Sequence, residues 1–148
     1  MIVLQEMEEK DSGQIAKLER EIFKDSWTQS GIEETWRETH SFIVVAKEED
    51  EVIGYCIVYC VLDEAEIARI AVRETKRHEG VGSKLLAKTE EKCRRLNVER
   101  MLLEVRESNA AARKFYAKQQ FAEDGIRKNF YNNPRENAVL MSKMICLQ

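Results

Sequence analysis

The sequence predicts a mixed α/β fold, in which a central, mostly antiparallel sheet with one parallel pair of strands is flanked by about four helices. Two observations carry this prediction. Apolar, β-branched runs at residues 42–46 and 52–62, separated by the acidic stretch 48–51, are typical of a β-hairpin. Farther along, a strand-like run at 66–72, a helical segment at 82–96 and a buried-type strand at 101–105 follow one another. Strand–helix–strand order implies that the two strands are parallel neighbours.

Length and composition indicate one soluble globular domain spanning 1–148, because the 148 residues are 43% hydrophobic and 34% charged. The net charge of -3 argues against nonspecific binding to nucleic acid or to membranes. The first residues lack the basic and apolar regions of a secretory signal. With only two histidines and no CxxC pair, no metal site is expected. We expect the four cysteines (Cys56, Cys60, Cys93 and Cys146) to be reduced in a cytoplasmic protein, with Cys56 and Cys60 as small core residues.

The first part of the chain is predicted to supply a short strand at 2–5 and two helices. Asp11, with Gln14 three residues later, resembles a capping box at the start of the first helix, and the second helix covers 28–38. Apolar residues follow at helical spacing: Ile15, Leu18 and Ile22 in the first helix, Ile32 and Trp36 in the second. Trp27, between the helices, is either a core residue or a wall of a substrate pocket.

The last part of the chain is predicted to supply a fourth helix and the remaining strands. Ser108 is expected to cap that helix. A strand near Phe121, a turn at Asp124-Gly125 and two final strands at 126–131 and 138–146 follow. The helical residues expected to face inward are Ala112, Phe115 and Tyr116.

The stretch KRHEGVGSKLL, residues 76–86, stands where the 66–72 strand must turn into a helix. Such a turn points unpaired N–H groups outward at a helix N-terminus, and Gly80 and Gly82 let a ligand approach the backbone closely. The pattern predicts a pyrophosphate site. A Walker loop needs a glycine five residues before Gly82, and a dinucleotide loop needs one at Leu85, and neither is present. The alternative is that the glycines only form a tight strand–helix turn.

Arg77-x-x-Gly80-x-Gly82 resembles the acetyl-CoA loop of the GNAT (GCN5-related) N-acetyltransferases. Three further segments resemble the bacterial members of that family that acetylate the N-terminal alanine of a ribosomal protein. They are DEAEIARIAV before the loop, LLEVRESNAAARKFYAKQQF after it, and IRKNFYNNPRENAVLM near the end. The resemblance covers nearly the whole chain. It implies the GNAT fold, in which the parallel pair is splayed at the cofactor site, and acetyl-CoA as co-substrate without a metal.

The resemblance implies that Glu104 is the general base and Tyr116 the general acid. A carboxylate in the apolar run 101–105 is costly unless it faces a cleft or is paired. Deprotonating an α-amine of pKa near 8 at pH 7 costs about 1 kcal/mol, against about 4.5 kcal/mol for lysine at about 10.4, so one glutamate suits an N-terminus. The alternatives are an edge glutamate paired with a nearby arginine, and a tyrosine that is only part of the core.

By the same resemblance, backbone groups of Ile70, Ala71 and Val72 pair with pantetheine like an added strand, and Asn109 bonds its lower part. The pyrophosphate site comprises Arg77, His78, Glu79, Gly80, Val81, Gly82 and Ser83, through backbone groups rather than the His78 and Glu79 side chains. Tyr131, Arg127 and Trp27 are expected near the acceptor, although packing or solvation explains Tyr131 and Arg127 equally well. The acidic residues at 63–66 either attract a basic peptide or form a solvated turn.

Two departures from the family pattern stand out. Gln119-Gln120 replaces leucine-glycine at a helix end, and Ser26-Trp27-Thr28 replaces proline-tryptophan-serine near the acceptor loop. The sequence therefore predicts an acetyl-CoA-dependent N-acetyltransferase whose acceptor is a ribosomal protein N-terminus, with a monomer plausible. The alternatives are the same chemistry on other protein N-termini or a small amine, and a non-catalytic acetyl-CoA-binding module, which would need neither Glu104 nor Tyr116.

Overall fold

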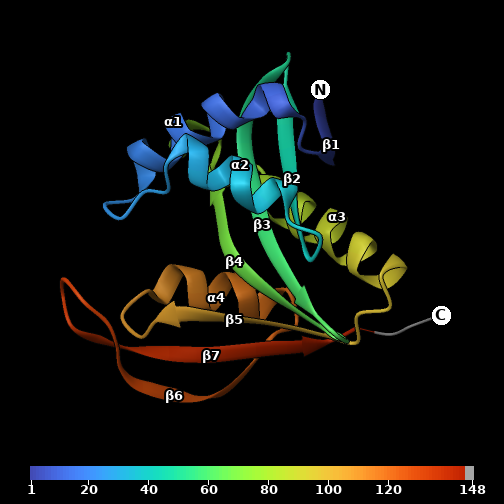
Figure 1. Ribbon diagram of the computed structural model, residues 1–148. Helices are drawn as coiled ribbons and strands as arrows, with labels where there is room; N and C mark the ends of the chain where they lie inside the picture. Colours follow the sequence, from blue (N-terminus) through green and yellow to red (C-terminus); the bar gives the residue numbers. More distant parts are fainter. Residues whose placement is uncertain (146–148) are drawn as a thin grey trace.

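Seven strands form one sheet in the order β1-β2-β3-β4-β5-β7-β6 in the computed structural model, which describes residues 1–145 (Figure 1). Every pair of neighbouring strands is antiparallel except β4 and β5, which are parallel, so the predicted mixed sheet is confirmed. The strands are β1 (Ile2–Glu6), β2 (Ser41–Glu48), β3 (Glu51–Val61), β4 (Glu64–Val72), β5 (Arg100–Arg106), β6 (Ala122–Tyr131) and β7 (Glu136–Met144).

Four α-helices cover the sheet, as expected. They are α1 (Ser12–Ile22), α2 (Gln29–Arg37), α3 (Val81–Arg95) and α4 (Ala110–Lys118), with 3-10 turns at Glu9–Asp11 and Glu74–Lys76. α1 and α2 pack on one face of the β1–β4 half, and α3 packs on the other (Figure 1). Side chains therefore alternate between two cores. In β2, Phe42 and Val44 join the α3 core while Ile43 and Val45 join the α1–α2 core.

The cysteines of the described chain are small core residues, as predicted for Cys56 and Cys60. Cys56 and Cys93 are fully buried and Cys60 is partly buried, and all three are free thiols. Burial raises the pKa of the Cys56 thiol to about 12, so it stays protonated and unreactive. Cys146 lies outside the described residues.

β4 and β5 pair over only three residues, Glu64 to Glu66 with Arg100 to Leu102, and then diverge. Residues 67–72 of β4 pair only with β3, so their other edge carries unpaired backbone groups. A β-bulge at Ala68, which has no partner between Ile67 and Arg69, adds twist at the point of divergence. The result is a wedge-shaped gap in the sheet.

The predicted capping box of Asp11 with Gln14 is wrong, because both side chains have tertiary partners. Asp11 is buried, where it ion-pairs with Lys47 at 2.8 Å and accepts a hydrogen bond from the Glu8 backbone amide at 2.8 Å. Gln14 instead accepts from the Val52 amide at 2.8 Å, joining α1 to the start of β3.

Two predictions in the last part of the chain are also wrong. Asp124-Gly125 is not a turn but a bulge within the continuous strand β6, where the pairing skips from Glu123 to Gly125. Ser108 does not cap α4. The N-cap is Asn109, whose side-chain oxygen accepts from the Ala112 amide at 3.1 Å.

Gln120 has a left-handed backbone, φ 76°, where helix α4 ends. Its amide donates to Ala117 and the Phe121 amide donates to Tyr116, both at 3.0 Å, which is the Schellman pattern usually completed by glycine. The Phe121 and Tyr116 rings, 5.5 Å apart, add the apolar contact of that motif.

We predict that Gln120→Gly raises the free energy of unfolding by about 1 kcal/mol, because glycine removes the left-handed strain of an L-residue. Urea unfolding measures the change, with Gln120→Ala as the control that keeps the strain and gives no gain. A variant less stable than the wild type would contradict the prediction.

Candidate active site

The loop between β4 and α3 presents free backbone amides at a helix N-terminus. Gly80, with φ 82°, precedes the 15-residue helix α3, and no side chain caps it. The amides of residues 78–83 donate to no other described residue. The Arg77 amide is an exception, since it bonds the Glu74 carbonyl at 3.3 Å, while its Nε donates to the Val72 carbonyl at 3.0 Å. The Arg77 amide is therefore not free to bind an anion, whereas the amides of residues 78–83 are.

The second loop glycine has a packing role. A Cβ at Gly82 would lie 3.2 Å from the Phe115 ring, so a glycine here lets α4 approach the start of α3 closely. Gln119 also donates to the Ser83 hydroxyl at 2.9 Å, tying the end of α4 to the same turn. Free amides, the dipole of α3 and an open backbone are a donor set that fits a phosphate group.

The residues expected along pantetheine lie beside the wedge. Ile70, Ala71 and Val72 belong to the β4 segment whose outer edge pairs with no strand, and this edge leads toward the glycine loop, where the Val72 carbonyl accepts a hydrogen bond from Arg77 Nε. An extended ligand can add to such an edge as a strand does. Asn109 stands at the start of α4, where its Oδ1 caps the helix, so only its amide nitrogen remains to donate to a ligand.

Glu104 projects from β5 on the face opposite the core. Leu103 and Val105 are buried in the α3 core, and strand alternation turns Glu104 to the other side. Its side chain is 17% exposed, and its Oε2 is buried without a hydrogen-bond partner. Arg127 Nη1 lies 3.6 Å away, an ion pair too long for a hydrogen bond. Burial raises the pKa of the Glu104 carboxyl, Glu66 adds to the rise and Arg127 opposes it.

Tyr116, on α4, belongs to the α3 core, against which Ile70 and Val72 of β4 also pack, and is 5% exposed. Its ring makes edge contacts with Phe115 at 5.1 Å and Phe121 at 5.5 Å between centroids. Its hydroxyl has no hydrogen-bond partner among the described residues. Burial above all raises the pKa of the phenol, with smaller contributions from Cys56 and Tyr131. The hydroxyl therefore keeps its proton at neutral pH.

Tyr131, at the end of β6, interacts electrostatically with both Glu104 and Tyr116. Burial and the nearby Glu104 carboxylate raise its pKa, and Tyr131 in turn contributes to the raised pKa of Tyr116. Arg106 lies 4.5 Å over the Tyr131 ring and donates to the carbonyls of Asn132 and Pro134, which fixes the β6–β7 connection. Tyr131 therefore lies within electrostatic range of both Glu104 and Tyr116.

A cluster of polar side chains that the sequence pattern did not reveal holds the α1–α2 loop. The fully buried Glu19 carboxylate accepts four hydrogen bonds: from the Tyr55 hydroxyl, from the Trp27 amide at 2.9 Å, and from Arg69 Nε and Nη2 at 3.0 Å each. Arg69 also donates to the Asp25 carbonyl at 3.0 Å. The available signal was the position of Glu19, four residues after Ile15 on the apolar stripe of α1.

The same cluster decides where Trp27 lies. Its side chain is partly buried against the edge of the α1–α2 core, and its amide is held by Glu19. Asp25, in the same loop, makes a small contribution to the raised pKa of Tyr131. Trp27 is therefore an edge residue of the α1–α2 core.

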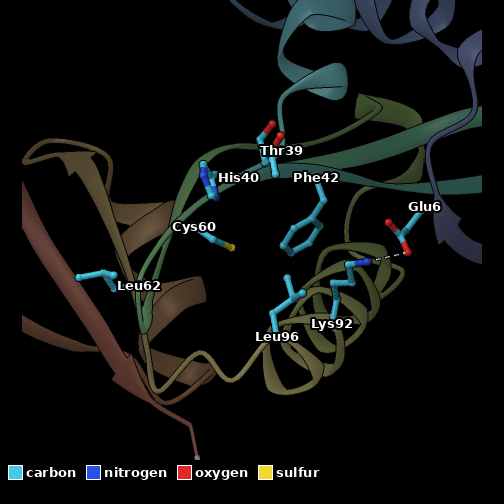
Figure 2. Close-up of a pocket in the computed structure, with 9 residues that line it drawn as sticks. Glu6, Thr39, His40, Phe42, Cys60, Leu62, Lys92 and Leu96 are labelled. Atoms are coloured by element: carbon cyan, nitrogen blue, oxygen red, sulfur yellow. Dashed lines mark hydrogen bonds and ion pairs between the residues drawn. The ribbon is translucent and has the colours of Figure 1, made fainter.

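Two hollows in the described structure lie away from Glu104 and Tyr116. One, of about 280 Å³, lies between the end of α3 and strands β2 and β3, with Phe42, Cys60 and Lys92 in its lining (Figure 2). The other, of about 450 Å³, lies between α1 and the glycine loop and includes Arg77. Within residues 1–145, no cluster of three or more acidic, cysteine or histidine side chains is arranged to hold a metal. No helix in the same range is long and apolar enough to span a membrane.

Comparison with known proteins identifies the class. The model of the acetyltransferase (GNAT) family matches residues 12–121, so the chain belongs to that family and is an acetyl-CoA-dependent N-acetyltransferase.

Individual relatives and solved structures have more specific names than the family. The chain is 34% identical to the ribosomal protein bS18-alanine N-acetyltransferase of Haemophilus influenzae, over 96% of this chain and 98% of that one. The crystal structure of the ribosomal-protein-S18-alanine N-acetyltransferase of Escherichia coli superposes with a TM-score of 0.90 at 27% identity, covering 100% and 96% of the two chains. An aminoglycoside 6'-N-acetyltransferase complexed with coenzyme A shares the fold, with a TM-score of 0.85 at 16% identity over 99% and 100%.

We predict that Arg69→Met lowers the free energy of unfolding by about 3 kcal/mol, because the buried Glu19 carboxylate loses its charged partner. Urea unfolding measures the loss. Arg20→Met, which removes an exposed arginine next to Glu19, is the matched control and changes little. A loss below about 1 kcal/mol for Arg69→Met would show that the ion pair does not hold the loop.

Proposed function

We propose that the protein transfers the acetyl group of acetyl-CoA to the N-terminal α-amine of a protein, and that its acceptor is the N-terminal alanine of ribosomal protein bS18. The observation that carries the proposal is the buried Glu104 oxygen with no hydrogen-bond donor, next to the wedge between β4 and β5. A carboxylate in that state accepts a proton from an incoming amine readily. The named relatives support the choice of acceptor. An acceptor on the ribosome implies a cytoplasmic enzyme.

The donor is held by groups that fit its parts. Amides of residues 78–83 at the start of α3 bind the pyrophosphate, the unpaired edge of β4 from Ile70 to Val72 binds the pantetheine, and the Asn109 side-chain nitrogen donates to its lower part. When bound, acetyl-CoA supplies an activated thioester. Residues 70–72 also include an amide able to polarise its carbonyl oxygen.

Glu104 and Tyr116 divide the proton transfers. Glu104 takes a proton at Oε2 from the acceptor amine, directly or through water, so that the neutral amine can attack. Tyr116 holds its proton at the phenol oxygen and donates it to the departing sulfur. With a phenol near 10 and a thiol near 8.5, ordinary values make that transfer uphill by about 2 kcal/mol. The raised pKa of Tyr116 in the free protein keeps the phenol protonated before the reaction and adds to this uphill cost.

The surroundings of Glu104 favour an α-amine. An α-amine of pKa near 8 needs about 1 kcal/mol to become neutral at pH 7, whereas a lysine side chain needs about 4.5 kcal/mol. A single carboxylate whose own pKa is raised by burial is a strong enough base for the smaller of these two free energies, that of the α-amine. Tyr131 and Trp27 border the acceptor in this proposal, from the β6 end and the α1–α2 loop respectively.

Mass spectrometry tests the proposal directly. Purified protein is incubated with acetyl-CoA and a short peptide carrying the bS18 N-terminus, and with the same peptide blocked at its α-amine as the control. We expect one acetyl group on the free peptide and none on the blocked one. Transfer to a polyamine alone would replace the acceptor with a small amine, and cofactor binding without any transfer would indicate a non-catalytic module.

We predict that Tyr116→Phe lowers kcat by about a hundredfold, the scale of a general acid, with little change in acetyl-CoA affinity. Steady-state kinetics and a cofactor titration measure the two effects. Phe121→Leu, which alters the neighbouring ring contact and keeps the hydroxyl, is the control for packing. Unchanged turnover in Tyr116→Phe would remove this residue from the mechanism.

We predict that Glu104→Gln loses most activity near neutral pH and regains part of it at high pH, where the free amine is already neutral. In the wild type, activity falls as pH drops through the raised pKa of Glu104, because the protonated carboxyl cannot act as a base. A pH–rate profile of both proteins tests this. An equal loss at every pH would mean that Glu104 positions the acceptor without taking its proton.

A further inference from the structure

We propose that Arg127 is a positioning residue for the base: its guanidinium, held against Phe130, is the counter-ion of Glu104 in the free protein, and the acceptor's amine takes its place. This inference rests on the proposed function for its second half only. The pairing of Glu104 with Arg127 is a property of the protein without either substrate.

The geometry of the pair supports the role. Arg127 Nη1 faces Glu104 Oε2, which is the same oxygen that lacks a hydrogen-bond donor. At 3.6 Å the guanidinium supplies charge and leaves the lone pairs of that oxygen unoccupied. An acceptor amine and Arg127 would therefore contend for one oxygen, and the amine can form the shorter, hydrogen-bonded contact.

Phe130 explains how the guanidinium is held without closing on the carboxylate. The Arg127 Cζ lies 5.0 Å from the centroid of the Phe130 ring, within the range of a cation–π contact. The Arg127 side chain is 54% exposed, in contrast to the 17% of Glu104, so it can turn into solvent as the acceptor enters. The guanidinium therefore contacts the Phe130 ring in the free protein and can move into solvent when the acceptor binds.

The other charged groups around Glu104 come from different strands and act in opposite directions. Glu66 on β4 raises the pKa of Glu104, Arg127 on β6 lowers it, and the Tyr131 phenol on β6 responds to the same carboxylate. Arg127 is the only cation that contributes to the pKa of Glu104 among the described residues. Losing it would leave a partly buried base whose remaining charged neighbour is another carboxylate.

The geometry of the Arg69–Glu19 pair differs from that of the Arg127–Glu104 pair and supports the role proposed for Arg127. Arg69 binds Glu19 with two hydrogen bonds of 3.0 Å and is 14% exposed, a pair that is locked in place. Arg127 has a single longer contact and is half exposed. The Glu19–Arg69 pair is thus fixed, whereas the Glu104–Arg127 pair can open. Only in the second pair does a carboxylate oxygen lack a hydrogen-bond donor, so that it can accept one from a substrate.

A titration of the protein without substrates tests the pairing itself. The Glu104 side-chain carboxyl carbon is followed by NMR in protein labelled with 13C-glutamate, and its signal is identified by its loss in Glu104→Gln. We expect the pKa of Glu104 to rise in Arg127→Gln, to rise less in Arg127→Lys, and to fall in Glu66→Gln. Lys128→Gln removes the same charge from the next residue, which forms no ion pair with Glu104, and serves as the matched control.

Kinetics test the consequence for turnover. Because the ionised base is required, the acid limb of kcat/KM should move to higher pH in Arg127→Gln. A one-unit move would lower kcat/KM by about tenfold below both pKa values and leave it within about twofold above them. Lys128→Gln should retain the wild-type profile.

Two results would overturn the inference: an unchanged or lower pKa of Glu104 in Arg127→Gln, or an equal shift in Lys128→Gln. A uniform loss of kcat/KM at all pH values in Arg127→Gln would instead make Arg127 a structural or acceptor-binding residue and contradict the role. If the wild type acetylates no amine, the proposed function fails, whereas the NMR titration still decides whether Arg127 is the counter-ion.

Discussion

The short pairing of β4 with β5 is the constraint on which the site depends. Three paired residues hold the two strands together at one end, and beyond Glu66 and Leu102 the sheet opens (Figure 1). A continuous sheet would satisfy the backbone of β4 and bury its edge. The divergence leaves that edge free for an extended ligand and exposes groups from both sides of the sheet to one gap. Glu104 lies on β5 beyond the last residue paired with β4, and Tyr116 on α4 belongs to the core cluster against which Ile70 and Val72 of β4 pack.

The two buried glutamates, Glu19 and Glu104, differ in how many hydrogen bonds their carboxylates accept. Glu19 accepts four hydrogen bonds and fixes a loop, since a buried carboxylate with all its partners is rigid. Glu104 keeps one oxygen without a donor, which costs stability, and in the proposed function this oxygen takes the proton of the acceptor amine. The number of hydrogen bonds that each carboxylate accepts therefore distinguishes Glu19 from Glu104, although both lie among apolar neighbours and both face an arginine.

Much of the fold could be read from local patterns. The hairpin, the parallel pair and the helix after Gly80 were predicted because apolar periodicity and turn residues act over a few positions. The errors arose where a side chain has a distant partner. Gln14 bonds to the β3 backbone rather than to its own helix, and the Asp124-Gly125 bulge is decided by pairing with β7. For the site, the glycine loop and the unusual carboxylate of β5 were visible, whereas the Glu19 cluster was not.

The sequence by itself determined the α/β class, the glycine turn into a helix, and which residues are chemically out of place, because these depend on residue type and spacing. The tertiary structure decided which carboxylate is satisfied, which arginine is locked and which amides are free. Those properties depend on contacts between segments far apart in the chain, such as Arg69 with Glu19 and Arg127 with Glu104. No spacing rule encodes a distance of 3.0 Å or 3.6 Å across the fold, and here that difference separates a fixed ion pair from an exchangeable one.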